Sequence, residues 1–302
     1  MKYIFAWVLA LVVLTSGIAA AQTPTEAEAS AEMRRMIELR DSLKPINGVV
    51  ALPSAKASLN LGTQYYFLSA EDARKVLTEG WGNPPSASSD VLGMVFPIGK
   101  TFLDDTWGAV VRYEHTHYVS DEDASTADYD AMMTDIKASV GKENVEREKG
   151  GYSPLTVFGW AQPPTYNATR HDLIWAEDIQ FGDEKDHTLN YDVRHLGRSG
   201  VLSMNIISTM SKLPEVRQAA VNVGATAEFD AGSRYADYEA GDQKAEYGLA
   251  GLVAAGVGLG VAKKAGLLAV ALVFLKKGAF IIAAAAAGLA GWVRKFLRRK
   301  DV

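Results

Sequence analysis

Two apolar segments, one at each end of the chain, constrain its fold more than any other feature of the sequence. The first runs from Tyr3 to Ile18, and the second occupies most of residues 247–293. Soluble domains do not carry apolar runs of this length on their surface, so both segments are expected to meet a membrane or the export machinery. Residues 22–244 remain for a folded body, a length that suits one large domain or two smaller ones.

The N-terminal segment has the three parts of a signal peptide. Lys2 supplies the positive charge at its start, the apolar run follows, and Ala19-Ala20-Ala21 offers small residues for cleavage before Gln22. The alternative is an uncleaved N-terminal anchor. In both cases the residues that follow are exported, and the lack of cysteine excludes a lipoprotein that is anchored through a cysteine.

Pairs of lysines divide the C-terminal segment into three apolar stretches. The stretches cover residues 247–262, 265–275 and 278–293, and Lys263-Lys264 and Lys276-Lys277 separate them. A membrane-spanning helix needs about 20 apolar residues, which no stretch supplies alone. A lysine pair at the bilayer centre costs about 5–7 kcal/mol, and the large apolar side chains of the last two stretches recover roughly the same amount. The number of spans and their boundaries therefore stay open.

The charge of the C-terminus favours a single crossing. Five basic residues lie between Arg294 and Lys300, and basic residues prefer the cytoplasmic side of a membrane. A hairpin of two spans would leave them outside, whereas one crossing within 247–293 places them in the cytoplasm. The sequence thus predicts four parts: a signal peptide 1–21, an extracytoplasmic body 22–244, a membrane anchor 245–293 and a basic cytoplasmic tail 294–302.

The anchor also holds a candidate contact between membrane helices. Gly256 and Gly260 have the spacing of small residues that lets two helices approach closely, which makes self-association one interpretation. Glycine and alanine are abundant throughout this segment, so the same spacing also arises by chance.

Charge is divided unevenly between the body and the C-terminal region. Residues 22–244 carry 21 basic and 34 acidic side chains, whereas residues 245–302 carry nine basic and two acidic ones. An acidic body disfavours nucleic acid as a partner, because phosphate binding needs a basic surface. The basic C-terminus is joined to apolar sequence, so the lipid bilayer is its expected partner. The chain has no cysteine, which excludes disulfides and thiolate metal sites.

The body shows the pattern of an α+β fold with an antiparallel sheet. Strand-like runs separated by short turn-rich segments predict a meander flanked by helices. The expected helices cover residues 25–43, 69–78, 128–140 and 214–222. The expected strands cover 49–52, two short runs within 57–68, 91–97, 107–113, 154–161, 172–181, 188–196, 200–209 and 226–229, with Pro163-Pro164 as one of the separators. One or more transmembrane helices would follow at the C-terminus.

The body and its C-terminal end carry a set of distinctive short motifs, which include Trp81-Gly82-Asn83-Pro84-Pro85, Leu92-Gly93-Met94, Gly159-Trp160-Ala161, Leu189-Asn190-Tyr191, Leu196-Gly197-Arg198 and Arg234-Tyr235-Ala236-Asp237-Tyr238. Together they resemble a known family, the bacterial membrane-anchored proteins of unknown function DUF2167. The resemblance covers roughly residues 45–275 and implies an exported domain on a C-terminal anchor in the bacterial inner membrane, with the body periplasmic or otherwise extracytoplasmic. It implies no activity, and His117 stands where the family pattern has glycine.

Two groups of side chains are weak candidates for a metal site. His115 and His117 would lie on one face of a strand and supply half of a metal site, but no third ligand has suitable spacing. Asp121 and Asp123 flank Glu122 in a cluster that suits a hard cation such as Ca²⁺, although it lacks the pattern of an EF-hand loop. The simpler interpretations are surface histidines and a turn that caps the helix from about residue 126. We therefore predict no metal and no cofactor.

No recognised catalytic motif occurs in the chain. Arg194 and Arg198 flank His195, and such arginines either hold a carboxylate or phosphate ligand or form structural ion pairs. The sequence thus favours an interaction or scaffold protein of the envelope over an enzyme. The alternative is an envelope enzyme of unrecognised type, for which Asp121, Asp123, Arg194 and Arg198 are the weak candidates. Other envelope proteins, or a second copy of the chain, are the expected partners besides lipid.

Overall fold

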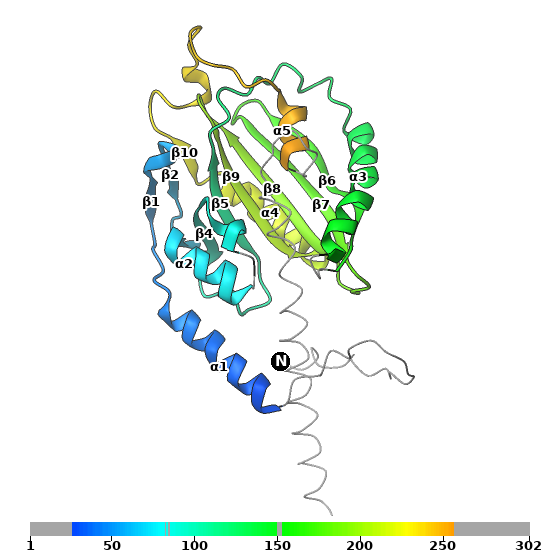
Figure 1. Ribbon diagram of the computed structural model, residues 1–302. Helices are drawn as coiled ribbons and strands as arrows, with labels where there is room; N and C mark the ends of the chain where they lie inside the picture. The colour runs from blue at the N-terminus through cyan, green and yellow to red at the C-terminus, as the bar shows by residue number, and fades with distance from the viewer. Residues whose placement is uncertain (1–25, 82, 84, 150–152, 257–302) are drawn as a thin grey trace, which may run out of the picture. The chain divides into compact units, whose positions relative to one another are not determined.

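The computed structural model describes residues 26–81, 83, 85–149 and 153–256 (Figure 1). The predicted signal peptide, the basic tail and all of the predicted anchor after residue 256 lie outside these residues. The chain divides into two compact units, of which the larger is Leu39–Leu275. The helix α1 (Glu26–Ser42) begins in the other unit, and everything described below belongs to the larger one. Within the described residues, none of the helices combines the length and the apolar composition that a membrane span requires.

A seven-stranded antiparallel sheet, sheet A, forms the centre of the larger unit. Its strand order is β3-β4-β5-β9-β8-β7-β6. Strands β6 to β9 run as a continuous meander, and β9 then pairs with β5 and joins the two halves of the sheet. The predicted α+β fold with an antiparallel meander is confirmed. The strands are β3 (Tyr65–Ser69), β4 (Val91–Pro97), β5 (Gly108–Glu114), β6 (Leu155–Asn167), β7 (Asp172–Phe181), β8 (Thr188–Leu196) and β9 (Val201–Thr209).

Strand β6 departs from the sequence prediction because it continues through Pro163-Pro164, which we expected to end it. Its pairing with β7 shifts register three times, including once between Gln162 and Thr165. Proline lacks an N–H group, but β6 is the edge strand of sheet A and needs ladder hydrogen bonds on one side only. The bulged edge position therefore accommodates both prolines.

One face of sheet A, which we call the α4 face, is covered by α4 (Leu213–Gly224) and by a second, small sheet. The small sheet has the order β1-β2-β10 and consists of β1 (Val49–Leu52), β2 (Ala57–Asn60) and β10 (Ala227–Phe229). Alternate residues of β8 and β9, such as Val193 and Met204, meet Val216 and Val223 of α4 in one apolar cluster. This face is an ordinary apolar core.

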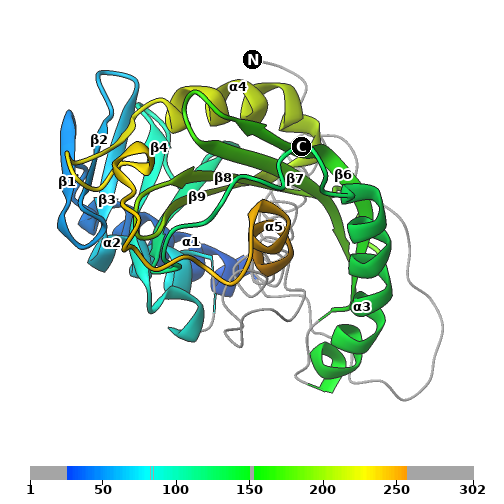
Figure 2. The same cartoon turned by 90° about the horizontal axis from the view of Figure 1, so that it is seen from above.

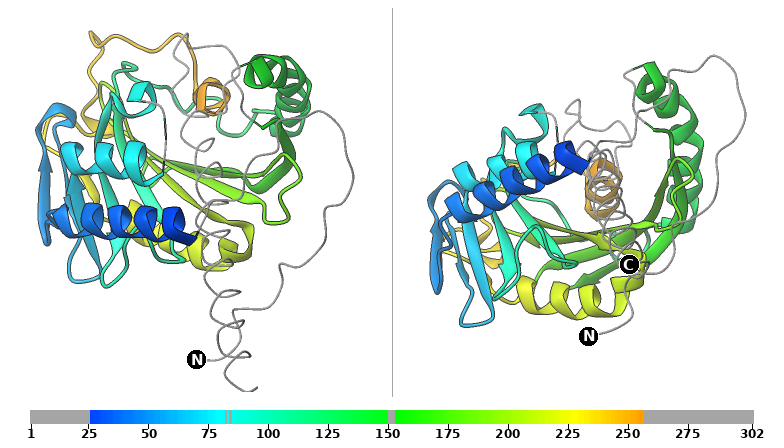
Figure 3. Two further views of the ribbon diagram at one scale, coloured as in Figure 1. Left: turned by 60° about the horizontal axis from the view of Figure 1, so that its bottom comes forward. Right: turned by 90° about the horizontal axis from the view of Figure 1, so that it is seen from below.

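Three helices cover the opposite face, which we call the α5 face. They are α2 (Ala70–Lys75), α3 (Tyr129–Lys149) and α5 (Leu249–Gly256). Helix α2, with the π-turn η2 (Val76–Gly80), packs beside β3 and β4, and α3 packs along β6. Figures 2 and 3 show α5 on the side of the sheet away from α4, between α2 and α3.

Helix α5 shows that the folded body extends further than its predicted end at residue 244. Leu249, Leu252 and Val253 are fully buried in one cluster with Trp175 and other residues of sheet A. The sequence pattern assigns the residues of α5 to the membrane anchor, because they are as apolar as the sequence that follows. In the structure they belong to the core of the body.

The remaining helices agree with the prediction in type, with changes at their ends. Helix α3 continues to Lys149, nine residues past its expected end, and begins after Asp128, whose carboxylate accepts a hydrogen bond from the amide of Ala131. The hydroxyl of Ser69 caps α2 by accepting a hydrogen bond from the amide of Asp72. The short 3₁₀ turns are η1 (Pro53–Ala55), η3 (Pro85–Ser88), η4 (Met210–Lys212) and η5 (Tyr235–Asp237).

Candidate functional site

Polar and charged side chains are buried on the α5 face at the centre of sheet A. We call this set the buried polar network. Its members lie on four adjacent strands, where they occupy alternate positions and therefore share one face. All are buried except Glu114, which is partly exposed. The network consists of Arg112, Glu114, Glu177, Asn190, Asp192, Arg194, Ser203 and Asn205.

Hydrogen bonds between side chains connect the network across three strands. The amide nitrogen of Asn190 donates to Glu177 Oε2 over 3.1 Å. The amide nitrogen of Asn205 donates to Asn190 Oδ1 over 2.7 Å and to Asp192 Oδ2 over 3.0 Å. The register explains these contacts, because Glu177 pairs directly with Asn190 and Asp192 pairs directly with Asn205. The chain of bonds therefore links β7, β8 and β9 beneath the helices.

Glu177 holds its proton at neutral pH. Burial, and after it the nearby negative charge of Asp192, raise the pKa of its carboxyl group to about 8 against the opposite effects of Asn190 and Arg194. A carboxyl group without a directly paired cation prefers its neutral form in a low-dielectric environment. Glu177 thus contributes hydrogen bonding to the network without a buried negative charge.

Arg194 carries the positive charge at the centre of the network and is completely buried. Its guanidinium forms ion pairs with Glu114 and, over 3.1 Å, with Asp192, and it stacks 5.2 Å above the ring of Trp175. Burial works to lower its pKa, but the two carboxylates outweigh this effect and raise it. Removal of one partner of such a buried ion pair strongly destabilises the protein, because the other charge then stays buried without a counter-charge.

Within the part of the chain that the structure describes, three polar atoms beneath the helices have neither a hydrogen-bond nor an ion-pair partner. They are Nε1 of Trp175, Nε of Arg194 and Oγ of Ser203, and all three residues are fully buried. An unsatisfied buried polar group costs about 1–3 kcal/mol, so most such groups in folded proteins have a partner. Ser203 lies between two arginines, since it pairs with Arg112 on one side and with Arg194 on the other.

Gly256, the last described residue of α5, lies directly on this part of the network. A Cβ atom at Gly256 would lie 2.5 Å from the Trp175 ring and 3.2 Å from Nη2 of Arg194, so only glycine allows this close approach. The eight residues of α5 are leucine, valine, alanine and glycine and offer no polar side chain to the unsatisfied groups. The helix therefore covers a polar surface with an apolar one.

The start of α5 is fixed by a residue far away in the sequence. Both carboxylate oxygens of Asp123 accept hydrogen bonds from helix amides, from Leu249 over 2.9 Å and from Ala250 over 3.0 Å. A Cβ atom at Gly248 would collide with this carboxylate at 2.6 Å. Asp123 thus caps α5, and the expectation that the acidic turn caps the helix from about residue 126 is corrected.

A second group of polar side chains lies at the end of sheet A where β7 begins and β8 ends. Nδ1 of His195 faces Asp172 Oδ1 at 2.5 Å, and Arg170 pairs with the other oxygen of the same carboxylate at 2.7 Å. Nearby, the hydroxyl of Tyr166 bonds to Asp121 and to Nδ1 of His171, each over 2.8 Å. Burial lowers the pKa of His171. Both imidazoles are thus held through Nδ1.

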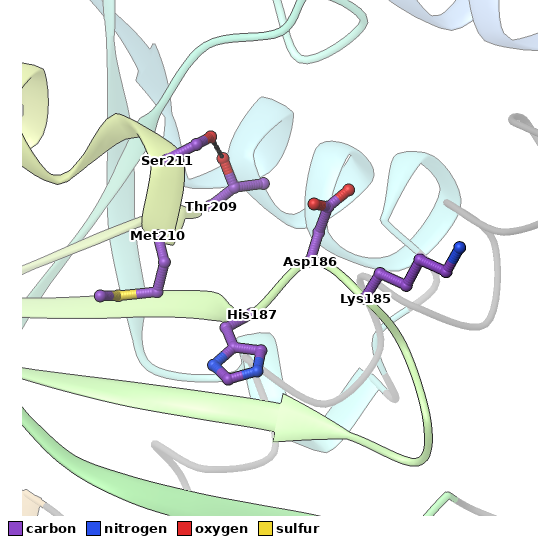
Figure 4. A pocket seen from close by; sticks show the side chains of 6 residues that line it. All are labelled: Lys185, Asp186, His187, Thr209, Met210 and Ser211. Carbon is purple, nitrogen blue, oxygen red and sulfur yellow. Dashed lines mark hydrogen bonds between the residues drawn. The ribbon is translucent and has the colours of Figure 1, made fainter. Parts of the chain in front are cut away.

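A surface pocket of about 310 Å³ lies beside the turn between β7 and β8 (Figure 4). His187 contributes to its wall and is held by Asp178, 2.6 Å from its Nδ1, while the hydroxyls of Thr209 and Ser211 bond to each other over 2.8 Å. Figure 4 shows Lys185 and Asp186 pointing away from this pair of hydroxyls. The polar groups therefore do not converge on one point. The lining consists of Lys185, Asp186, His187, Thr209, Met210 and Ser211.

The two predicted histidine candidates do not lie on a strand. Strand β5 ends at Glu114, so His115 and His117 fall in the following loop, where His117 adopts a left-handed backbone with φ of 64°. The ring of His115 packs against Tyr113. Among the residues that the structure describes, no three His, Cys, Asp or Glu side chains are grouped closely enough to hold a metal ion.

The structure separates the other predicted candidates. Asp121 belongs to the Tyr166–His171 group, Asp123 caps α5, and Arg194 lies in the buried polar network. Arg198 forms ion pairs at the surface with Asp242 at 2.7 Å and with Glu239 at 3.2 Å. Each candidate thus has an internal partner, and the four do not meet at one site.

Comparison with known proteins places the chain in a family. The family described as protein of unknown function DUF2167 matches residues 44–287, which is most of the chain, so the protein belongs to this family. No curated protein matches the sequence. Among solved structures, the solution structure of cyanobacterial PsbP (CyanoP) from Synechocystis sp. PCC 6803 is 8% identical, with a TM-score of 0.36 over 63% of this chain and 93% of that one. That similarity is too low to bear on the fold or function of this chain.

Proposed function

We propose that the protein is an exported interaction or scaffold protein whose body stands directly on a membrane anchor. The observation that carries the proposal is α5. This helix is built into the core of the body, and its described residues extend to Gly256, inside the apolar stretch 247–262 that opens the predicted anchor. A crossing within 257–293 would therefore begin close in sequence to the core of the body, and such a short connection suits a domain that acts at the membrane surface.

The internal contacts of the candidate catalytic residues also support this function. Arg194, Arg198, Asp121 and Asp123 each serve another part of the fold through an ion pair, a hydrogen bond or a helix cap. Groups that act on a substrate need atoms free to contact it. The interaction function requires no such group.

Reporter fusions test the exported body and the anchor. Alkaline phosphatase fused after Gly241 is expected to be active, and the same reporter fused after Lys300 is expected to be silent. Activity at both positions would replace the single crossing by a hairpin. Inactivity after Gly241 would contradict export of the body and with it the proposed function.

Crosslinking in intact membranes tests the interaction itself. A tagged full-length chain is expected to capture the same envelope protein, or a second copy of itself, in repeated experiments. The matched control is a tagged chain that ends at Gly256, which keeps α5 but lacks the anchor. Recovery of no product above an unrelated tagged membrane protein would count against a scaffold.

One observation favours an envelope enzyme as the second candidate. Asp172 contacts both His195 and Arg170. A carboxylate in this position orients an imidazole in the way that many hydrolases orient a histidine general base. Complementation of a deletion strain separates the two functions: an enzyme would lose function in His195→Gln while keeping normal protein levels. An interaction protein would retain function in that variant.

A further inference from the structure

The inference concerns α5 and what holds it against sheet A. Three of its residues, Leu249, Leu252 and Val253, are completely buried, and their removal from water favours the docked position. The described part of α5, residues 249–256, also depends on the cap that Asp123 supplies to its first amides.

The surface beneath α5 opposes docking. Nε1 of Trp175 and Nε of Arg194, on the two residues that Gly256 contacts, have no hydrogen-bond partner among the described residues when the helix is in place. Water would satisfy both groups if the helix moved away. The free energy gained by burying apolar side chains of α5 is therefore partly offset by the cost of these unsatisfied polar groups, which arises only when the helix is docked.

The attachment of α5 is also local. Its amides at Leu249 and Ala250 are held by one carboxylate, that of Asp123, and its last residue rests on Trp175 and Arg194. Sheet A beneath it is held independently by its strand ladder, by α2 and α3, and by the apolar core of the α4 face. The loss of α5 would thus leave the rest of the body folded.

We propose that α5 is a releasable lid, which opens and closes over the buried polar network while the rest of the body stays folded. In the closed form it seals Trp175 and Arg194 from water. In the open form these groups are hydrated and the apolar side of α5 is exposed. The proposal does not depend on where the protein resides, because it concerns packing within the body.

The chain offers a specific test because it has no cysteine. Val253→Cys places one thiol on the buried side of α5, and Val223→Cys places one on the buried side of α4, at a position that is equally inaccessible. A thiol reagent reaches the first site when the lid opens but reaches the second only when the α4 face is breached. In the purified full-length chain we expect Val253→Cys to react at least about tenfold faster than Val223→Cys.

Removal of the cap sharpens the test. Asp123→Ala is expected to speed the reaction of Val253→Cys about fivefold, the effect of losing one helix cap, and to leave that of Val223→Cys unchanged. The matched control is Asp128→Ala, which removes the cap of α3 and should not affect Val253→Cys. Circular dichroism of each variant establishes that the body is folded.

Equal reaction rates at the two positions would overturn the proposal, since both thiols would then be exposed only by global unfolding. Equal acceleration by Asp123→Ala and Asp128→Ala would overturn it as well. If Val253→Cys does not fold, Leu252→Cys on α5 and Val216→Cys on α4 form a second pair of fully buried sites, to which the same criteria apply.

Discussion

The two faces of sheet A are covered in different ways. The α4 face meets α4 and the small sheet mainly through apolar side chains, whereas the α5 face carries eight polar or charged residues in its centre. Apolar packing needs only matching shapes, but a polar network needs a partner for every group. The α5 face lacks three of those partners, which makes it the less stable of the two covers.

The largest effect is expected from loss of the central charge. Arg194→Met leaves Glu114 and Asp192 without their cation and should lower the free energy of unfolding by about 3–5 kcal/mol. The triple variant Arg194→Met/Glu114→Gln/Asp192→Asn should recover most of this loss, because no uncompensated charge then remains. Denaturant unfolding measures both. A loss in the triple variant as large as in Arg194→Met would show that the arginine acts through packing and not through charge.

The next effect depends on pH. Burial raises the pKa of Glu177 to about 8 from its ordinary value near 4.5. At a pH between these two values, the folded state therefore keeps a proton that the unfolded state releases. Stability from this group is therefore complete below about pH 4.5 and is lost as the pH rises through about 8. Glu177→Gln should match the wild type at pH 4.5 and exceed it at pH 9 by a few kcal/mol. Parallel stability curves of the two proteins would mean that Glu177 titrates normally.

A smaller effect is expected at two helix glycines. Gly256→Ala places a methyl group against Trp175 and should destabilise the protein by about 1–3 kcal/mol. Gly141→Ala in α3 meets nothing within 4 Å and should stabilise by up to about 1 kcal/mol through helix propensity. Thermal unfolding compares the pair. A neutral Gly256→Ala would show that α5 does not rest on Trp175 in solution.

Most of sheet A could be predicted because each strand carries a local signal. Alternating apolar residues, with turn residues between the runs, predict the meander β6 to β9 and the positions of β4 and β5. The passage of β6 through Pro163-Pro164 was missed, since nothing in the local sequence indicates that the strand lies at an edge of the sheet.

Helix α5 was missed because its determinants are not local. Its composition is that of the apolar sequence after it, and its capping residue, Asp123, precedes it by more than a hundred positions. The buried polar network was missed for a related reason. Asn190, Asp192 and Arg194 alternate with apolar residues along β8, a pattern that normally indicates a solvent-exposed side of a strand. Only tertiary structure shows that helices cover this side.

Hydrogen exchange of the unmodified full-length chain tests the difference between the two faces most directly. The account predicts that amides of α5, residues 249–256, exchange through a local opening and much faster than those of α4, residues 213–224, whose protection should equal that of the central strands β8 and β9. It also predicts that a low concentration of denaturant changes the exchange of α4 more than that of α5, because local opening exposes little surface. Equal protection of α4 and α5, with the same dependence on denaturant, would contradict it.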